Sequence, residues 1–94
     1  MQDDRFEWND AKARANLKKH EVSFEVARRV FDDPAVVDRL DDDGTHAEDR
    51  SVITGMVDGS LLTVVYTVRE ERIHIISARK ATRREQDRYL SQDF

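Results

Sequence analysis

The second half of the chain alternates apolar and polar positions with the two-residue period of β-strands. This alternation predicts three strands, near residues 51–57, 60–69 and 72–80. Asp58-Gly59 lies between the first two and is typical of the type I′ turn that closes a tight hairpin. A second turn is expected at Glu70-Glu71. Because short turns join antiparallel neighbours, the three segments predict an antiparallel β-meander.

In the first third of the chain, apolar residues recur at the three- and four-residue spacing of a helix. One helix is expected near 10–20, where Asn9 or Asp10 can cap its first turn. A second is expected near 23–32 and is ended by Pro34, which keeps the preceding residue out of the α region. The first helix has a thin apolar face of Ala11, Ala15 and Leu17, and the second has a clear stripe of Phe24, Ala27, Val30 and Phe31.

The end of the chain predicts a third helix, near 82–91. Thr82 and Glu85 have the spacing of a capping box, and Tyr89 and Leu90 are its expected apolar contacts. Two short strand-like segments and an acidic stretch expected to be an exposed loop complete the chain; these are 6–8, 36–37 and 41–49.

The last predicted strand carries apolar residues on both faces, so we expect the sheet to be partly covered on both sides. Unbroken alternation puts Ile73, Ile75, Ser77 and Arg79 on one of these faces. The 94 residues suffice for one domain. We therefore expect a single α+β domain over 1–94, with a small antiparallel sheet, two N-terminal helices and a C-terminal helix.

Charge and composition narrow the class of protein. The net charge is −4, which argues against nonspecific nucleic-acid binding as the main behaviour, yet all seven basic residues after position 50 fall between Arg69 and Arg88. Without cysteine, neither a disulfide nor a Cys-based zinc site is possible. No apolar run approaches the roughly 20 residues of a membrane span, and the polar N-terminus is unlike a signal peptide. We expect a cytoplasmic protein.

Candidate chemistry rests on scattered charged residues, because no phosphate-binding glycine loop or hydrolase motif is present. Lys19-His20 could pair a cation with a titrating imidazole, or be a solvated helix end. Arginines at strand ends could hold a phosphate, or only protect the sheet edge from aggregation. Three dispersed histidines do not predict a metal site. The strand-end residues are Arg69, Arg72, Arg79 and Lys80; Glu48 and Arg50, before the meander, could be a surface ion pair.

Taken in order, these segments resemble the BrnT family, the toxins of BrnT–BrnA type II toxin–antitoxin systems. The resemblance spans nearly the whole chain. Its most specific parts are Lys19-His20 followed by Ser23-Phe24, and Ile76-Ser77-Ala78-Arg79 near the end. The other matching segments are Phe6–Asp10, Asn16, Ala27, Val30–Pro34, Glu48–Arg50, Gly55, Val65–Thr67, Arg69, Arg72-Ile73, Ile75, Lys80-Ala81, Glu85 and Tyr89.

This resemblance implies a RelE-like fold and an endoribonuclease that blocks translation by cutting RNA without a metal or other cofactor. It implies a cognate BrnA-like antitoxin that binds DNA, a complex of two toxins and two antitoxins, and repression of the operon by that complex, with operator DNA contacted only through the antitoxin. Where the family has glycine after Lys-His, this chain has Glu21, which adds a negative charge beside the implied site.

Such an enzyme would use the 2′-hydroxyl of RNA as nucleophile and leave a 2′,3′-cyclic phosphate. His20 or Glu48 could be the general base, and His20 is favoured because its ordinary pKa lies near neutrality. The cations expected to hold the phosphate, on one concave surface, are Lys19, Arg50, Arg69 and Arg79. Two other interpretations stay open: a catalytically weak or inactive homologue that binds the antitoxin, and an interaction domain unrelated to toxins.

Overall fold

The structure is a computed structural model that describes residues 1–41 and 50–92. Most of the predicted exposed loop at 41–49 therefore lies outside the described residues. No helix within the described ranges is long and apolar enough to cross a membrane. In chain order the elements are β1 (Phe6–Glu7), α1 (Asp10–His20), α2 (Phe24–Ala27), the 3-10 helix η1 (Arg28–Asp32), β2 (Val37–Asp41), β3 (Arg50–Val57), β4 (Ser60–Arg69), β5 (Arg72–Lys80) and α3 (Arg83–Leu90).

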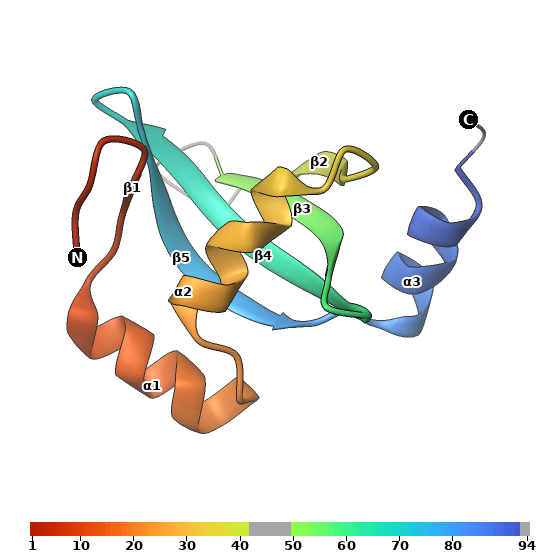
Figure 1. Ribbon diagram of the computed structural model, residues 1–94, viewed down its shortest axis with the longest axis horizontal. Helices are drawn as coiled ribbons and strands as arrows, with labels where there is room; N and C mark the ends of the chain where they lie inside the picture. Colours follow the sequence, from red (N-terminus) through yellow and green to blue (C-terminus); the bar gives the residue numbers. More distant parts are fainter. Residues whose placement is uncertain (42–49, 93–94) are drawn as a thin grey trace.

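Within residues 1–41 and 50–92, five strands form one sheet in the order β1-β5-β4-β3-β2 (Figure 1). Strands β2 to β5 pair antiparallel, which confirms the predicted meander and the short strand after Pro34. At the other edge β1 pairs parallel to β5, with Phe6 opposite Ile73. The predicted antiparallel sheet is therefore extended at this edge by one short parallel strand. A two-residue strand has too little pattern to reveal the direction of its partner.

Both predicted hairpin turns are present, and both have positive φ at their two central residues, as was expected for Asp58-Gly59. Asp58 and Gly59 have φ angles of 49° and 83°, and Glu70 and Glu71 have φ angles of 49° and 66°. A type I′ turn requires positive φ at both central residues, and its twist matches that of the flanking strands. Each turn therefore fixes the register of the strand pair that directly adjoins it.

The core lies between one face of the sheet and the segment formed by α2 and η1 (Figure 1). Phe24, Ala27 and Val30 are fully buried, as their stripe predicts. Phe31 is only half-buried, and its ring packs edge-on against Phe6 and Tyr66 at centroid distances of 5.3 and 5.0 Å. The predicted single helix at 23–32 is in fact a turn of α-helix that tightens into η1.

Helix α1 has the predicted bounds but buries a different face. The expected face of Ala11, Ala15 and Leu17 is exposed, and Leu17 keeps 49% of its surface accessible. The buried residue is instead Asn16, which binds backbone groups of neighbouring elements. The prediction failed because the buried face was inferred from the spacing of apolar residues, and a buried polar residue such as Asn16 does not contribute to that spacing.

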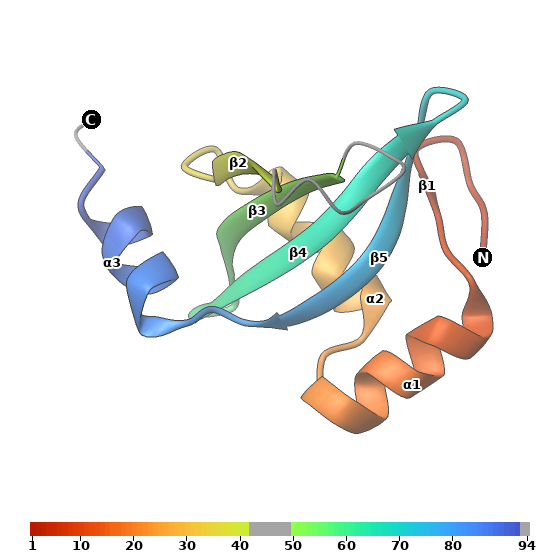
Figure 2. The same cartoon turned by 180° about the vertical axis from the view of Figure 1, so that it is seen from behind.

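A β-bulge in β5 changes which of its side chains share a face. Val65 pairs with Ser77 whereas Tyr66 pairs with Ile75, so Ile76 is an extra residue. Ile75 and Ala78 consequently both join the core, and the predicted face that combined Ile75 with Arg79 is wrong. Arg79 lies opposite Thr63 on the face of the sheet that points away from α2; Figure 2 shows α2 behind the sheet.

Candidate functional site

The last turn of α1 is tied to β5 by the buried side chain of Asn16. Its Nδ2 donates to the carbonyls of Val22 and Ala78, at 2.9 and 2.8 Å. Its Oδ1 accepts from the N–H of Ala78 at 3.2 Å. A buried amide with three backbone partners fixes its helix strongly, because breaking any of them would leave a polar group unsatisfied. Asn16 thereby fixes where the C-terminal end of α1 meets the sheet.

Lys19 and His20, both predicted as site residues, lie in this last turn. They line a shallow hollow of about 280 Å³ between α1 and the bulged part of β5, which contributes Ile76 and Ser77. His20 is half-buried and Lys19 is exposed. A lysine and an imidazole thus lie beside the strand that carries Arg79, two residues after Ser77.

Arg79 binds Glu85, the N3 residue of α3, through a bidentate ion pair. Nη1 and Nη2 donate to Oε1 and Oε2 at 2.6 and 3.0 Å. Glu85 is 8% exposed at its side chain and also accepts from the N–H of Thr82 and the hydroxyl of Thr63. The predicted capping box of Thr82 and Glu85 is confirmed. The same carboxylate therefore caps α3 and holds the arginine.

Hydrogen bonds between Arg79 and Glu85 favour the charged form of both side chains. Burial raises the pKa of Glu85, but hydrogen bonds from Arg79, Thr82 and Thr63 outweigh it and lower that pKa to about 2. The hydrogen bonds to Glu85 raise the pKa of Arg79 in turn. Glu85 is consequently ionised at all physiological pH values.

The remaining predicted arginines share a face with Arg79 but are distant from it. Thr54 pairs with Thr63, which pairs with Arg79, so these three residues form one row across the sheet. Arg50 lies four residues from that row along β3, about 13 Å, and Arg69 lies six residues from it along β4, about 20 Å. The structure therefore gathers Lys19, His20 and Arg79 around one end of β5 and leaves Arg50 and Arg69 towards the other. Glu48 lies outside the described residues.

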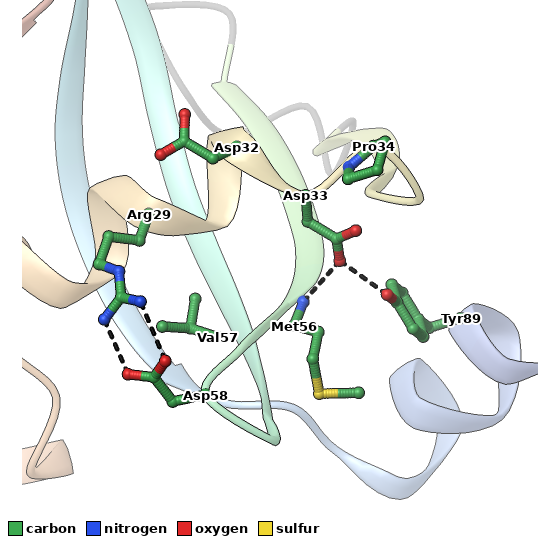
Figure 3. A pocket seen from close by; sticks show the side chains of 8 residues that line it. All are labelled: Arg29, Asp32, Asp33, Pro34, Met56, Val57, Asp58 and Tyr89. Atoms are coloured by element: carbon green, nitrogen blue, oxygen red, sulfur yellow. Dashed lines mark hydrogen bonds and ion pairs between the residues drawn. The ribbon is translucent and has the colours of Figure 1, made fainter.

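A second hollow, of about 440 Å³, is lined by residues that we did not predict as functional (Figure 3). Asp33 lines this hollow, and its Oδ2 accepts hydrogen bonds from the N–H of Met56 and the hydroxyl of Tyr89, both at 2.7 Å. Beside it Arg29 makes a bidentate ion pair with Asp58. Asp33 thus joins η1, β3 and α3.

The sequence contained only indirect signals of this junction. Tyr89 was expected to make apolar contacts, but its hydroxyl binds Asp33, and the other expected contact of α3, Leu90, is 67% exposed. Gly55 offers a better clue, because a Cβ there would lie 2.9 Å from Cγ1 of Val30. Only glycine lets η1 approach β3 this closely.

Within the described residues, no group of three or more His, Asp or Glu side chains is placed to hold a metal ion. The chain matches a family described as "Ribonuclease toxin, BrnT, of type II toxin-antitoxin system" over residues 8–85. That range runs from Trp8, just before α1, to Glu85, and includes Lys19, His20 and Arg79. No curated protein matches the chain. Because the match covers 78 of 94 residues, the chain belongs to the BrnT family of ribonuclease toxins of type II toxin–antitoxin systems.

Proposed function

We propose that this toxin is a metal-independent endoribonuclease that cuts RNA in the cytoplasm and thereby inhibits translation. Its cleavage site, in this proposal, lies near the C-terminal end of β5. The observation that carries this proposal is the position of Lys19 and His20 in one hollow beside Ser77, two residues from Arg79. An imidazole beside one cationic side chain, with a second cation two residues further along the adjoining strand, supplies the kinds of group that RNA transesterification needs.

In the proposed step, His20 takes the proton of a ribose 2′-hydroxyl. The 2′-oxygen attacks the adjacent phosphorus, and the bond from phosphorus to the 5′-oxygen of the next nucleotide breaks. Lys19 and Arg79 stabilise the extra negative charge of the phosphorane. The leaving 5′-oxygen takes up a proton from water, and His20 releases the proton that it accepted to the solvent. The products are a 2′,3′-cyclic phosphate and a 5′-hydroxyl. Glu48 is the alternative general base.

Arg50 and Arg69 have a different role in this proposal. They lie on the same face of the sheet as Arg79 but about 13 and 20 Å along it. At those distances they would bind neighbouring phosphates of the RNA rather than the one that is cut. Their loss should weaken RNA binding and its salt dependence more than the chemical step.

The test is cleavage of RNA by purified protein, with the new ends mapped chemically. His20→Ala and Lys19→Ala should each reduce the rate at least a hundredfold, as is typical for general bases and charge-stabilising groups. Lys18→Ala is the matched control, because Lys18 lies in the same turn of α1 but outside the hollow. Undiminished cleavage by His20→Ala and Lys19→Ala would exclude this site.

Metal independence is tested on the same preparation. Protein treated with a chelator should cut RNA at the untreated rate, because Lys19 and Arg79 supply the positive charge that a metal would otherwise provide. Loss of cleavage that returns with magnesium or zinc would contradict the mechanism.

A second candidate function is that of a catalytically weak homologue that serves mainly to bind the antitoxin. It is favoured by one observation: Glu85 already occupies one end of the Arg79 guanidinium. Expression without antitoxin distinguishes the two, because only an active ribonuclease arrests growth and leaves cut RNA.

Membership of a type II toxin family implies an antitoxin partner. We propose that this BrnA-like antitoxin binds next to the cleavage site, in a complex of two toxins and two antitoxins that contacts operator DNA through the antitoxin and represses the operon. A mostly apolar hollow of about 320 Å³ adjoins the site, since Lys80 and Leu17 are among its lining residues. Size-exclusion chromatography with light scattering would measure the stoichiometry.

A further inference from the structure

The guanidinium of Arg79 uses only part of its donor set inside the protein. Its Nη1 donates to Oε1 of Glu85 at 2.6 Å and to the carbonyl of Lys80 at 3.3 Å, and its Nη2 donates to Oε2 of Glu85 at 3.0 Å. These bonds involve three of the five N–H groups of an arginine. The two others are on Nε and Nη2.

These two N–H groups form one edge of the planar guanidinium and are parallel. Two parallel donors match two oxygens of a phosphate, which is the basis of bidentate arginine–phosphate recognition. Among the residues that the structure describes, none accepts a hydrogen bond from Nε of Arg79, and the side chain is 33% exposed. No described residue thus uses this edge, and it belongs to a side chain that is one-third exposed.

We propose that Glu85 is a positioning residue: it holds one side of Arg79 and so presents the Nε–Nη2 edge of the guanidinium to an RNA phosphate. This inference rests on the proposed function only for the identity of the anion as RNA. The ion pair with Glu85 does not prevent Arg79 from binding phosphate, because a guanidinium can bind a carboxylate at one edge and a phosphate at another.

Glu85 can hold the arginine because it is itself held rigidly. Oε1 accepts from the N–H of Thr82 at 2.8 Å and from Oγ1 of Thr63 at 2.9 Å. Since Thr63 uses its only hydroxyl proton there, the 2.8 Å contact between its Oγ1 and that of Thr54 must be donated by Thr54. Two strands and the first turn of α3 thus fix one carboxylate.

Positioning and plain electrostatics predict different effects of neutralising Glu85, one on the chemical step and the other on binding. A carboxylate beside an RNA site repels phosphate, so its removal alone should tighten RNA binding. If Glu85 orients Arg79, its removal should slow the chemical step, because the guanidinium no longer lies where charge develops. Glu85→Gln keeps the capping box, which accepts glutamine at this position.

The first experiment uses inorganic phosphate as the probe and requires no RNA. The side-chain Nε–H signal of Arg79, assigned by its absence in Arg79→Ala, should shift on titration with phosphate in the unaltered protein. In Glu85→Gln that shift should fall several-fold. Asp87→Asn is the matched control, because Asp87 pairs with Arg83 on the exposed side of α3, and it should leave the shift unchanged. No shift in the unaltered protein, or an equal shift in Glu85→Gln, would overturn the proposal.

The second experiment measures RNA cleavage by the same proteins. Glu85→Gln should lower kcat about tenfold without raising KM, and Asp87→Asn should change neither. A kcat equal to or above that of the unaltered protein would overturn the proposal. If the phosphate shift behaves as expected but the unaltered protein cuts no RNA, positioning of Arg79 is supported and the ribonuclease step fails.

Thr63→Val serves if Glu85→Gln does not fold, as judged by circular dichroism. It removes one hydrogen bond to the carboxylate but keeps the charge. It should reduce the phosphate shift in the same direction and by a smaller factor, and an unchanged shift would count against the proposal.

Discussion

Glu21 follows α1 with a φ of 61° and a ψ of 25°, and its N–H donates to the carbonyl of Leu17. This left-handed conformation ends many helices and favours glycine, because a Cβ there crowds the following carbonyl. The resemblance to the BrnT family implied glycine at this position. Glu21 therefore adds a negative charge next to His20 and also adopts a backbone conformation that glycine would adopt with less strain.

We predict that Glu21→Gly raises the free energy of unfolding by about 1 kcal/mol, because it relieves the left-handed strain. Urea denaturation at constant slope measures the change. Glu25→Gly is the control: Glu25 is equally exposed but helical, and glycine there should lower stability by up to about 1 kcal/mol. Destabilisation by Glu21→Gly would show that the side chain of Glu21 contributes more than its backbone costs.

At the scale of elements, local signals were sufficient wherever one segment determines its own shape. Asp58-Gly59 predicted its turn, and Thr82 with Glu85 predicted α3, because turn and cap chemistry act within four residues. The bulge at Ile76 and the parallel pairing of β1 depend on contacts between distant segments, and no local pattern encodes them. The candidate site followed the same division: Lys19, His20 and Arg79 were predicted from their residue types, but the packing of Lys19 and His20 beside Ile76 and Ser77 was not.

Helix α3 is held to the sheet by charge, and this makes its attachment dependent on pH. The pKa of Glu85 is about 2 in the folded protein, against 4.5 for an ordinary glutamate. Because the unfolded chain takes up the proton first, the contribution of Glu85 is complete above about pH 4.5 and is lost as the pH falls towards 2. One such group changes stability by at most about 1.4 kcal/mol per pH unit.

We therefore predict that the stability difference between the unaltered protein and Glu85→Gln shrinks as the pH is lowered from 5.5 to 3. Other carboxylates whose pKa is lowered by hydrogen bonds, among them Asp33 and Asp58, are common to both proteins and so do not affect the difference. Urea midpoints at several pH values give the difference directly. A difference that does not vary with pH would mean that the ion pair with Arg79 contributes little.

Across the whole molecule, the two faces of the sheet carry different surfaces. The face away from α2 bears Arg50, Arg69 and Arg79, whereas the apolar hollow beside α1 and α2 exposes Leu17 and Val26, at 49% and 38%. Exposed apolar side chains gathered in one hollow are typical of a protein-binding surface. This division favours RNA on the basic face and the antitoxin in the hollow at its border.

Leu17→Asp should weaken antitoxin binding by at least tenfold, because it places a charge in the apolar hollow, and should leave RNA cleavage unchanged. Isothermal titration with purified antitoxin measures the first effect, and the RNA assay measures the second. Leu90→Asp is the control, since Leu90 is 67% exposed on α3 and does not line the hollow. Equal antitoxin affinities for both variants would place the interface elsewhere.

The parallel pairing of Phe6 with Ile73 also has a consequence for how the toxin is made. These partners are separated by 67 residues in the sequence. The side-chain amide of Asn16 likewise cannot bind the backbone of Ala78 until Ala78 has been synthesised. At a synthesis rate of about 5–20 residues per second, the first strand spends roughly 3 to 13 seconds without its partner. Lys19 and His20 are likewise synthesised long before Ile76 and Ser77, which line the same hollow. That hollow cannot form until β5 has been synthesised, so the proposed cleavage site is among the last parts of the fold to be completed.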